Sequence, residues 1–258
     1  MEERIDSLHV SNLRIIQAKE AFCFGIDAVL LADLGYKYLE KDLGLKKIKV
    51  TDLCSGNGII PLLLTGKTPF ELRKNLSVCG VEVQTDIARM AERSVKLNDL
   101  ESFITIFNGD LKDAANPDFC IEAESQDLVL VNPPYMIPSK GRQSSNKVKM
   151  IARQEILCNL KDVLKSAEVL LKKDGRFVMI HRYERLDEIL LEAEKTGFSE
   201  IEYTLVRPFE NQEPSLVLVS ALKKEKPEHQ KPCKKDDLII YSTQGEYTKE
   251  VKKIYGRE

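Results

Sequence analysis

Predicted strands and helices alternate along most of this chain, and that alternation restricts the possible folds more than any other feature. Short apolar runs ending at turn residues predict strands at 48–53, 77–82, 103–107, 127–131 and 176–181. The segments between them predict helices at 58–64, 86–98, 153–171 and 185–195. Strands separated by helices pair in parallel, with helices on both faces of the sheet. Apolar stretches at 201–207 and 215–221 lack an intervening helix, so we expect an antiparallel hairpin at one edge of a seven-stranded α/β sheet.

The composition excludes several classes of protein. The 258 residues include 39 Lys and Arg against 41 Asp and Glu, so an overall basic coat for nucleic acid is absent. No two of the six cysteines lie within four residues of each other, and only three histidines are present, which argues against a metal site. The longest apolar run, 59–64, is too short to cross a membrane. We therefore expect a cytoplasmic protein with reduced thiols, no metal and no membrane association.

A glycine-containing turn joins the first predicted strand to its helix. Small residues there let the backbone approach a ligand at the carboxyl end of the strand. Pro61 occupies the third glycine position of a G-x-G-x-x-G motif, which argues against a nicotinamide dinucleotide. An acidic residue before the glycines fits S-adenosylmethionine, which has an ammonium group and a ribose to hold. The expected cofactor contacts in this turn are Asp52, Cys54, Ser55, Gly56, Asn57 and Gly58.

Acidic residues also follow the next two predicted strands. Glu82 ends the second strand, where a carboxylate can accept hydrogen bonds from both ribose hydroxyls, and Val83 lies beside it. Asp110 follows the third strand with Leu111 beside it, in a position to meet the adenine amino group. Three acids at the ends of successive strands favour one cofactor site over three unrelated turns.

The fourth predicted strand ends in the motif Asn132-Pro133-Pro134-Tyr135. The prolines remove two N–H donors and fix φ, so carbonyl oxygens point outward as acceptors. Together with the Asn132 side-chain carbonyl, they can accept both hydrogens of a planar amino group. That arrangement favours a pyramidal nitrogen whose lone pair attacks a sulfonium methyl, and it needs positioning rather than a strong base. Tyr135 can stack on a flat substrate such as an extruded base.

Two polar segments interrupt the alternation. Residues 136–150, directly after the catalytic motif, contain no acidic residue, which suits a phosphate backbone near the reacting base. The basic residues expected to contact substrate there are Lys140, Arg142, Lys147 and Lys149. Residues 223–235 carry six lysines and two prolines, which is typical of a solvated linker and equally compatible with contacts to RNA.

The motifs resemble those of class I S-adenosylmethionine-dependent methyltransferases that modify amino nitrogens. The segments 22–32, 153–155 and 247–251 narrow the resemblance to the bacterial tRNA-Val (adenine-N6) methyltransferases, over almost the whole chain. This resemblance implies a Rossmann-like fold, a tRNA partner and, as target, the adenosine just 3′ of the anticodon. It also implies that Phe24, Gly25 and Asp27 pack against the cofactor site. In one respect the chain departs from the family, because Cys54 replaces the first glycine of D-x-G-x-G-x-G.

Several kinds of methyltransferase share the N-P-P-Y motif. The motif alone therefore does not show whether the target is an adenine amine, a guanine amine of rRNA or the side-chain amide of a release-factor glutamine. Release-factor enzymes carry a helical N-terminal domain, but only about 50 residues precede the glycine turn here. DNA enzymes usually add a target-recognition domain, whereas 37 residues follow Ala221. A protein that keeps the methyltransferase fold but has lost catalysis should also have lost the glycines, the ribose-binding acid or the asparagine of the motifs, and this chain keeps all of them. The histidine at 181 is expected to be structural, and the oligomeric state, monomer or dimer, stays open.

The expected organisation has three parts. Residues 1–45 form an N-terminal extension that packs on the cofactor site, 46–222 form the methyltransferase domain, and 223–258 form a basic linker and C-terminal tail.

Overall fold

The computed structural model describes residues 2–8, 12–18, 25–134, 158–226 and 230–256. Its strands are β1 (Glu3–Ser7), β2 (Arg14–Ala18), β3 (Ile48–Leu53), β4 (Leu76–Glu82), β5 (Ile104–Asn108), β6 (Gln126–Val131), β7 (Leu171–Arg182), β8 (Phe198–Arg207), β9 (Leu216–Lys223), β10 (Cys233–Lys234), β11 (Leu238–Ile239), β12 (Tyr241–Thr243) and β13 (Glu246–Tyr247). The α-helices are α1 (Ile26–Leu39), α2 (Ile59–Lys67), α3 (Thr85–Leu97), α5 (Leu160–Leu170), α6 (Leu186–Lys195) and α7 (Lys249–Ile254). Single 3-10 turns are η1 (Phe70–Asn75), η2 (Leu111–Ala115) and η3 (Tyr183–Arg185).

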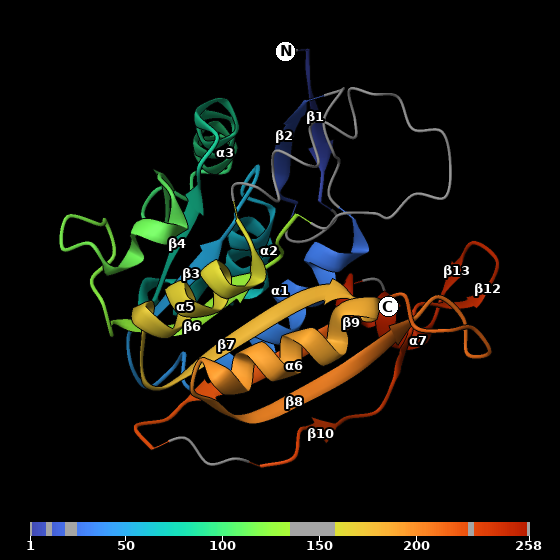
Figure 1. The fold of residues 1–258 in the computed structure, drawn as a ribbon. Helices are drawn as coiled ribbons and strands as arrows, with labels where there is room; N and C mark the ends of the chain where they lie inside the picture. The colour runs from blue at the N-terminus through green and yellow to red at the C-terminus, as the bar shows by residue number, and fades with distance from the viewer. Residues whose placement is uncertain (1, 9–11, 19–24, 135–157, 227–229, 257–258) are drawn as a thin grey trace.

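A nine-stranded sheet forms the centre of the molecule, in the order β10-β8-β9-β7-β6-β3-β4-β5, with β11 also paired to β8 (Figure 1). Strands β5, β4, β3, β6 and β7 are mutually parallel, and β9 inserts antiparallel between β7 and β8. The predicted α/β sheet with an antiparallel hairpin is therefore confirmed. The strand count differs because β10 and β11 add two residues each to the outer side of β8. Strands of two residues are too short to show the apolar alternation from which a strand is predicted.

The strand order reverses between β3 and β6, which makes this the switch point of the sheet. Ligands of open α/β sheets bind there, outside the carboxyl ends of the strands.

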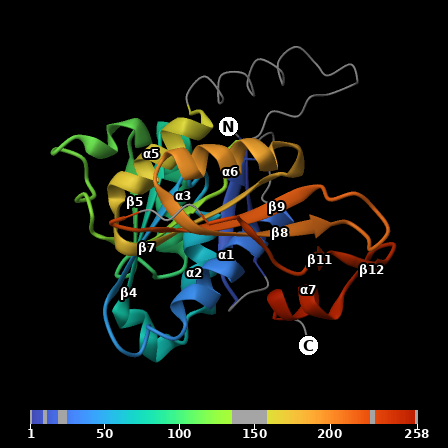
Figure 2. The same ribbon diagram turned by 60° about the horizontal axis from the view of Figure 1, so that its bottom comes forward.

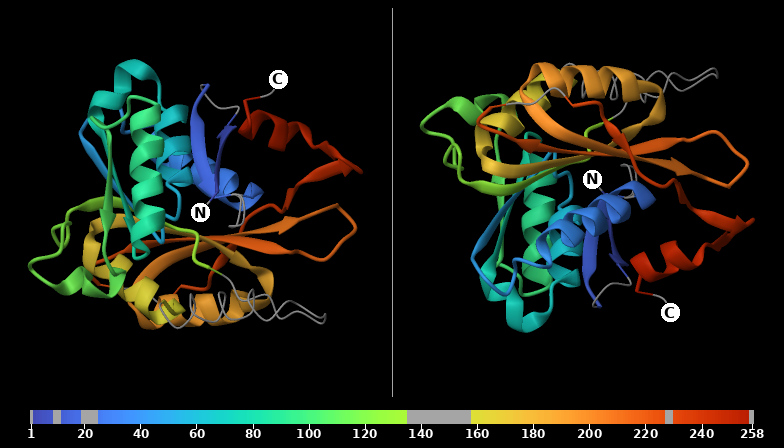
Figure 3. Two further views of the ribbon diagram at one scale, coloured as in Figure 1. Left: turned by 90° about the horizontal axis from the view of Figure 1, so that it is seen from above. Right: turned by 90° about the horizontal axis from the view of Figure 1, so that it is seen from below.

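Helices cover both faces of the sheet, with α5 and α6 on one side and α1, α2 and α3 on the other (Figure 3). Two apolar clusters fill the interfaces, and successive residues of β6 contribute to them alternately. Leu128 and Leu130 belong to the first cluster, whereas Val129 and Val131 belong to the second, beneath α5 and α6. Because both faces are covered, residues 128–131 of the strand are all apolar, which explains why this part of the sequence reads as an unbroken apolar run.

The C-terminal helix completes the first apolar cluster. Val251 and Ile254 of α7 are buried in that cluster, and α7 packs beside α1 (Figure 2). The Lys67 ammonium of α2 donates to the Ile254 carbonyl at 2.6 Å and pairs with Asp33 of α1 at 2.9 Å. Residues at the end of the chain are thus tied into the same core as the central sheet.

An N-terminal hairpin, β1 with β2, was not predicted and lies against α3. Side chains of α3 take the place of a neighbouring strand for β2. The backbone N–H of Ile16 donates to the Ser94 hydroxyl at 3.0 Å, while Asn98 exchanges hydrogen bonds of 2.8 and 2.7 Å with the Arg14 backbone. Tertiary contacts of this kind hold a polar hairpin in place without any local sequence signal.

Two helix boundaries differ from their predicted positions. Gln84, not Thr85, is the N-cap of α3, and the Thr85 hydroxyl donates to the Asn108 side chain at 2.8 Å. In the predicted helix 153–171, residues 153–157 lie outside the described part, and α5 begins after Asn159, whose side chain caps it. Strand β7 starts directly after α5, so the lysines and glycine at 172–175 belong to a strand rather than to a helix terminus.

Within the described part of the chain, no helix has both the length and the apolarity needed to cross a membrane.

Candidate active site

The predicted site residues come together because three neighbouring strands end level with one another. Leu53 of β3 is paired in register with Val81 of β4 on one side and with Val131 of β6 on the other. Adjacent strands lie only about 5 Å apart. The next residues along these strands, Cys54, Glu82 and Asn132, therefore emerge side by side at the switch point.

The turn after β3 has a backbone that approaches its neighbours closely. Gly56 and Gly58 have φ of 57° and 81°, a left-handed conformation that glycine adopts without strain. The Ser55 N–H donates to the Val81 carbonyl at 2.9 Å, which fixes the turn to β4. Gly80 was not singled out from the sequence, although a Cβ there would lie 2.5 Å from the Ser55 hydroxyl. A glycine inside a strand is the signal that would have indicated this close approach.

Glu82 is buried at the end of β4, and backbone N–H groups hold its carboxylate. Gly56 donates to one carboxylate oxygen at 3.0 Å, and Gln84 donates to the other at 2.9 Å. These contacts fix the carboxylate beside the glycine turn, the orientation that binding of a vicinal diol requires. Val83, the next residue, leaves 40% of its surface exposed and so offers an apolar contact for a flat ring.

Asp52 is a fully buried carboxyl group with no hydrogen-bond partner for either oxygen among the described residues. Burial raises the pKa of Asp52 from 3.8 to about 8; the neighbouring Ser55 hydroxyl opposes this rise, and the Glu82 carboxylate adds to it. The Ser55 hydroxyl is likewise buried, and it reaches no described partner at full hydrogen-bond geometry. A buried polar atom without a hydrogen bond lowers the stability of the folded protein. The Asp52 carboxyl and the Ser55 hydroxyl therefore mark a position where a polar group of a ligand could form the missing hydrogen bonds.

The raised pKa of Asp52 predicts that stability decreases as the pH rises between about 4 and 8. Below this window the carboxyl is protonated in both the native and the unfolded chain. Within it the unfolded chain loses the proton and the native protein keeps it, so the native state binds more protons. Unfolding free energies of the wild type and Asp52→Asn, measured by denaturant titration without cofactor, should diverge as the pH rises, with the variant more stable at pH 8. A constant difference between pH 5 and pH 8 would contradict this assignment.

Asp110 lies after β5 and caps the η2 turn. One carboxylate oxygen accepts from the Lys112 N–H at 3.0 Å, and the other pairs with the Lys112 ammonium at 3.2 Å. This contact raises the pKa of Lys112. Asp110 is therefore held locally, and Leu111 beside it is buried.

The N-terminal part of the chain reaches the glycine turn through β2. Gln17, a buried polar residue, accepts a hydrogen bond from the Asn57 side chain at 3.3 Å and also contacts Asp6. Gly25 and Asp27 lie at the start of α1, where an Asp27 carboxylate oxygen accepts from the Ala28 N–H at 2.9 Å.

Asn132 and Pro134 are half-buried after β6, and Pro133 is buried. The remaining predicted site residues lie outside the described part of the chain: Phe24, Tyr135, Lys140, Arg142, Lys147 and Lys149.

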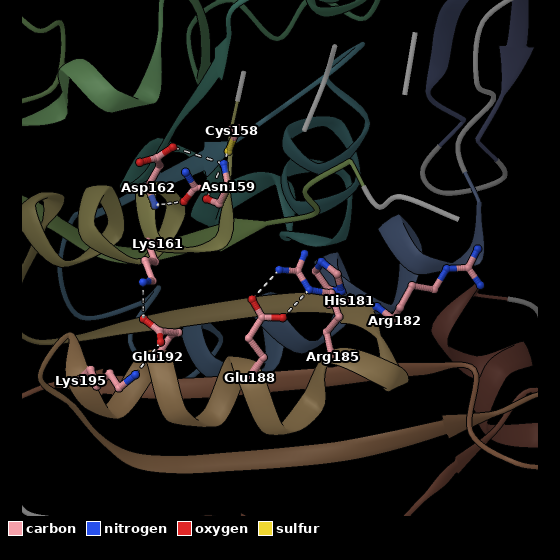
Figure 4. Close-up of polar contacts among 10 residues, drawn as sticks. All are labelled: Cys158, Asn159, Lys161, Asp162, His181, Arg182, Arg185, Glu188, Glu192 and Lys195. Atoms are coloured by element: carbon pink, nitrogen blue, oxygen red, sulfur yellow. Dashed lines mark hydrogen bonds and ion pairs between the residues drawn. The ribbon is translucent and has the colours of Figure 1, made fainter. Parts of the chain in front are cut away.

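His181 is the penultimate residue of β7, the strand next to β6, and is buried (Figure 4). Burial, with the nearby Arg185 guanidinium, lowers the pKa of His181 to about 4, so the imidazole is neutral at pH 7. Its Nδ1 accepts from the Arg182 N–H at 2.8 Å, while Arg185 forms a bidentate pair with Glu188 at 2.7 and 2.8 Å. These contacts are those of a structural residue.

Relatives identified by sequence share one name. Proteins named tRNA1(Val) (adenine(37)-N6)-methyltransferase from Proteus mirabilis and Porphyromonas gingivalis are 24% and 26% identical to this chain over 200 and 199 residues. These matches cover 77% of this chain in both cases, and 75% and 74% of the relatives. No family model matches the chain.

Similar solved structures share the fold. A predicted O-methyltransferase from Agrobacterium tumefaciens is 21% identical with a TM-score of 0.66, covering 90% of this chain and 96% of that one. A SAM-dependent O-methyltransferase from Thermotoga maritima is 16% identical with a TM-score of 0.54, covering 82% and 69%. The expected resemblance to the tRNA methyltransferases and the expected methyltransferase fold are thereby confirmed.

Proposed function

We propose that this protein transfers the methyl group of S-adenosylmethionine to the exocyclic N6 amine of an adenosine in tRNA, next to the anticodon of tRNA-Val. The observation that carries the proposal is the level ending of β3, β4 and β6, which brings the glycine turn and Glu82 beside Asn132. The names of the relatives support the choice of tRNA over rRNA guanine or a release-factor glutamine.

The described residues fit the cofactor. Glu82 is oriented to accept hydrogen bonds from the ribose hydroxyls, and Val83 offers an apolar surface for the adenine. The buried Asp52 carboxyl and Ser55 hydroxyl mark where a polar group of the cofactor, such as the ammonium group of its methionine part, would find hydrogen-bond acceptors. We assign the adenine amino group to Asp110. When bound, S-adenosylmethionine supplies the electrophilic methyl group.

The chain's own part in the reaction is to bind and orient the amine. Asn132 follows β6 directly, and its side-chain carbonyl together with the backbone carbonyl of Pro133 would accept the two N–H groups of the target. When both hydrogens of the amine are held by acceptors, its nitrogen lone pair is no longer conjugated with the ring. The lone pair would then point toward the cofactor. Catalysis by position and fixed dipoles needs no strong base, which agrees with a neutral, buried His181.

We assign the other parts of the chain by their contacts with this site. Residues 1–45 would support the glycine turn through the Gln17–Asn57 hydrogen bond, with residues 46–222 as the methyltransferase domain. Residues 223–258 and the basic residues of 136–150 would contact tRNA in the cytoplasm.

The direct test is methyl transfer from labelled S-adenosylmethionine to bulk tRNA from cells that lack the enzyme, followed by nucleoside mass spectrometry. We expect N6-methyladenosine to appear in the tRNA. Label in rRNA or in a release factor, with none in tRNA, would replace the substrate but keep the chemistry. Binding of the cofactor without transfer to any of the three would overturn the proposed function.

A further inference from the structure

Two cysteine side chains meet at the cofactor turn although they are 104 residues apart in the sequence. The Sγ atoms of Cys54 and Cys158 lie 3.8 Å from each other. Both thiols are free and half-buried. Cys54 opens the glycine turn, and Cys158 directly precedes Asn159, the N-cap of α5 (Figure 4).

The backbone of Cys54 gives a second, independent observation. Its φ is 61°, in the left-handed region that favours glycine. A side chain in that conformation is strained relative to the ordinary right-handed region. Glycine would form the same turn without this cost, so the turn itself does not explain the cysteine. The contact with Cys158 does give the side chain a chemical role.

We propose that Cys54 and Cys158 form a reversible disulfide when the protein meets a peroxide, and that this cross-link weakens cofactor binding. The second half of the statement rests on the proposed function, whereas the first half rests only on the two thiols.

The reaction balances with peroxide as the oxidant. The hydrogen bond to Cys158 and burial raise the pKa of the Cys54 thiol, so we assign the first step to Cys158 and the second to Cys54. The Cys158 sulfur attacks one peroxide oxygen, the O–O bond breaks, and a sulfenic acid and one water are formed. The Cys54 sulfur then attacks the sulfenic sulfur, the S–O bond breaks, and a second water leaves with the thiol proton. An external dithiol reverses the cross-link and is itself oxidised.

The cross-link would act on the cofactor site through the backbone of the turn. A disulfide needs about 2.05 Å between the sulfur atoms and a fixed dihedral angle, so bond formation constrains the Cys54 side chain and, through it, the turn. Gly56, two residues from Cys54, donates to the Glu82 carboxylate that we assign to the ribose. Displacing this donor should raise the Kd for S-adenosylmethionine about tenfold, the change that a loss of about 1.4 kcal/mol produces. By linkage, bound cofactor should disfavour the cross-linked state, so less of the disulfide should remain at equilibrium with a dithiol.

The test treats the full chain with hydrogen peroxide and maps disulfides by non-reducing peptide mass spectrometry. We expect a peptide pair linking Cys54 to Cys158, its disappearance with dithiothreitol, and a smaller cross-linked fraction at equilibrium in a dithiol redox buffer when S-adenosylmethionine is present. Cys158→Ser should give no linked pair, and its cofactor affinity should survive the treatment. Cys120→Ser is the matched control, because Cys120 neighbours Cys79 in a second thiol pair and is itself exposed.

The possible failures can be told apart. A cross-link between Cys79 and Cys120 alone, or further oxidation of Cys158 without any cross-link, would overturn the proposed site. A Cys54–Cys158 link that leaves the Kd unchanged would overturn its effect on the cofactor. Because the link is detected by mass without RNA, a failure to methylate tRNA would disprove the proposed function and leave this result intact.

Discussion

Replacing Asn132 with alanine should lower kcat for methyl transfer by about 10²–10³-fold, the loss seen when one fixed polar group that stabilises a transition state is removed. Asn132 follows β6 at the switch point, and its side-chain carbonyl is the acceptor that we assign to one hydrogen of the target amine. The alanine variant keeps the two prolines but loses that acceptor. Single-turnover kinetics with saturating tRNA and cofactor would measure the chemical step directly.

Two further measurements make the Asn132 result specific. The Kd for S-adenosylmethionine, measured by calorimetry, should change little, because the groups assigned to the cofactor lie on β3, β4 and β5. Asn116→Ala, in an exposed loop after η2, is the matched control and should retain wild-type kcat. Turnover by Asn132→Ala within a few-fold of wild type would remove the proposed role.

The Glu82→Gln variant should bind S-adenosylmethionine about 10- to 100-fold more weakly, because hydrogen bonds to a charged group contribute about 1.5–3 kcal/mol. The carboxylate accepts from Gly56 and Gln84 and is thereby fixed at the edge of the site. A glutamine has only one acceptor oxygen, so its amide nitrogen would face either an N–H donor or the ribose. Calorimetric titration gives the Kd, and kcat at saturating cofactor should fall much less.

Variants of other acids show whether the Glu82 effect belongs to the site. Asp110→Asn should weaken binding less, since both Asp110 oxygens already contact Lys112. Glu101→Gln changes an exposed carboxylate in the turn before β5 and should bind the cofactor normally. Equal losses in all three variants would indicate a general effect of charge rather than a ribose contact.

The central sheet was predictable because its parallel strands are buried on both faces. The run 128–131 is apolar throughout, and its residues enter the two apolar clusters alternately. The positions of Glu82 and Asn132 followed from the same pattern, since parallel strands place their carboxyl ends at one edge.

Other features depend on contacts between distant segments, which no local pattern reveals. Strand β2 is held by Ser94 and Asn98 of α3, residues about 80 positions away. The meeting of Cys54 with Cys158 depends on how α5 packs over the sheet. The pKa of Asp52 depends on complete burial beside Glu82, which a sequence does not quantify.

The burial of α7 has a consequence for synthesis of the protein. The second apolar cluster consists of residues between Leu53 and Ala221, so it is complete before α7 is translated. The first cluster includes Leu8 near one end of the chain and Ile254 near the other, so it closes only when α7 has left the ribosome. Until then, the face of α1 that contacts Val251 and Ile254 is exposed to water in the nascent chain. We expect a ribosome-associated chaperone to cover this apolar surface during synthesis.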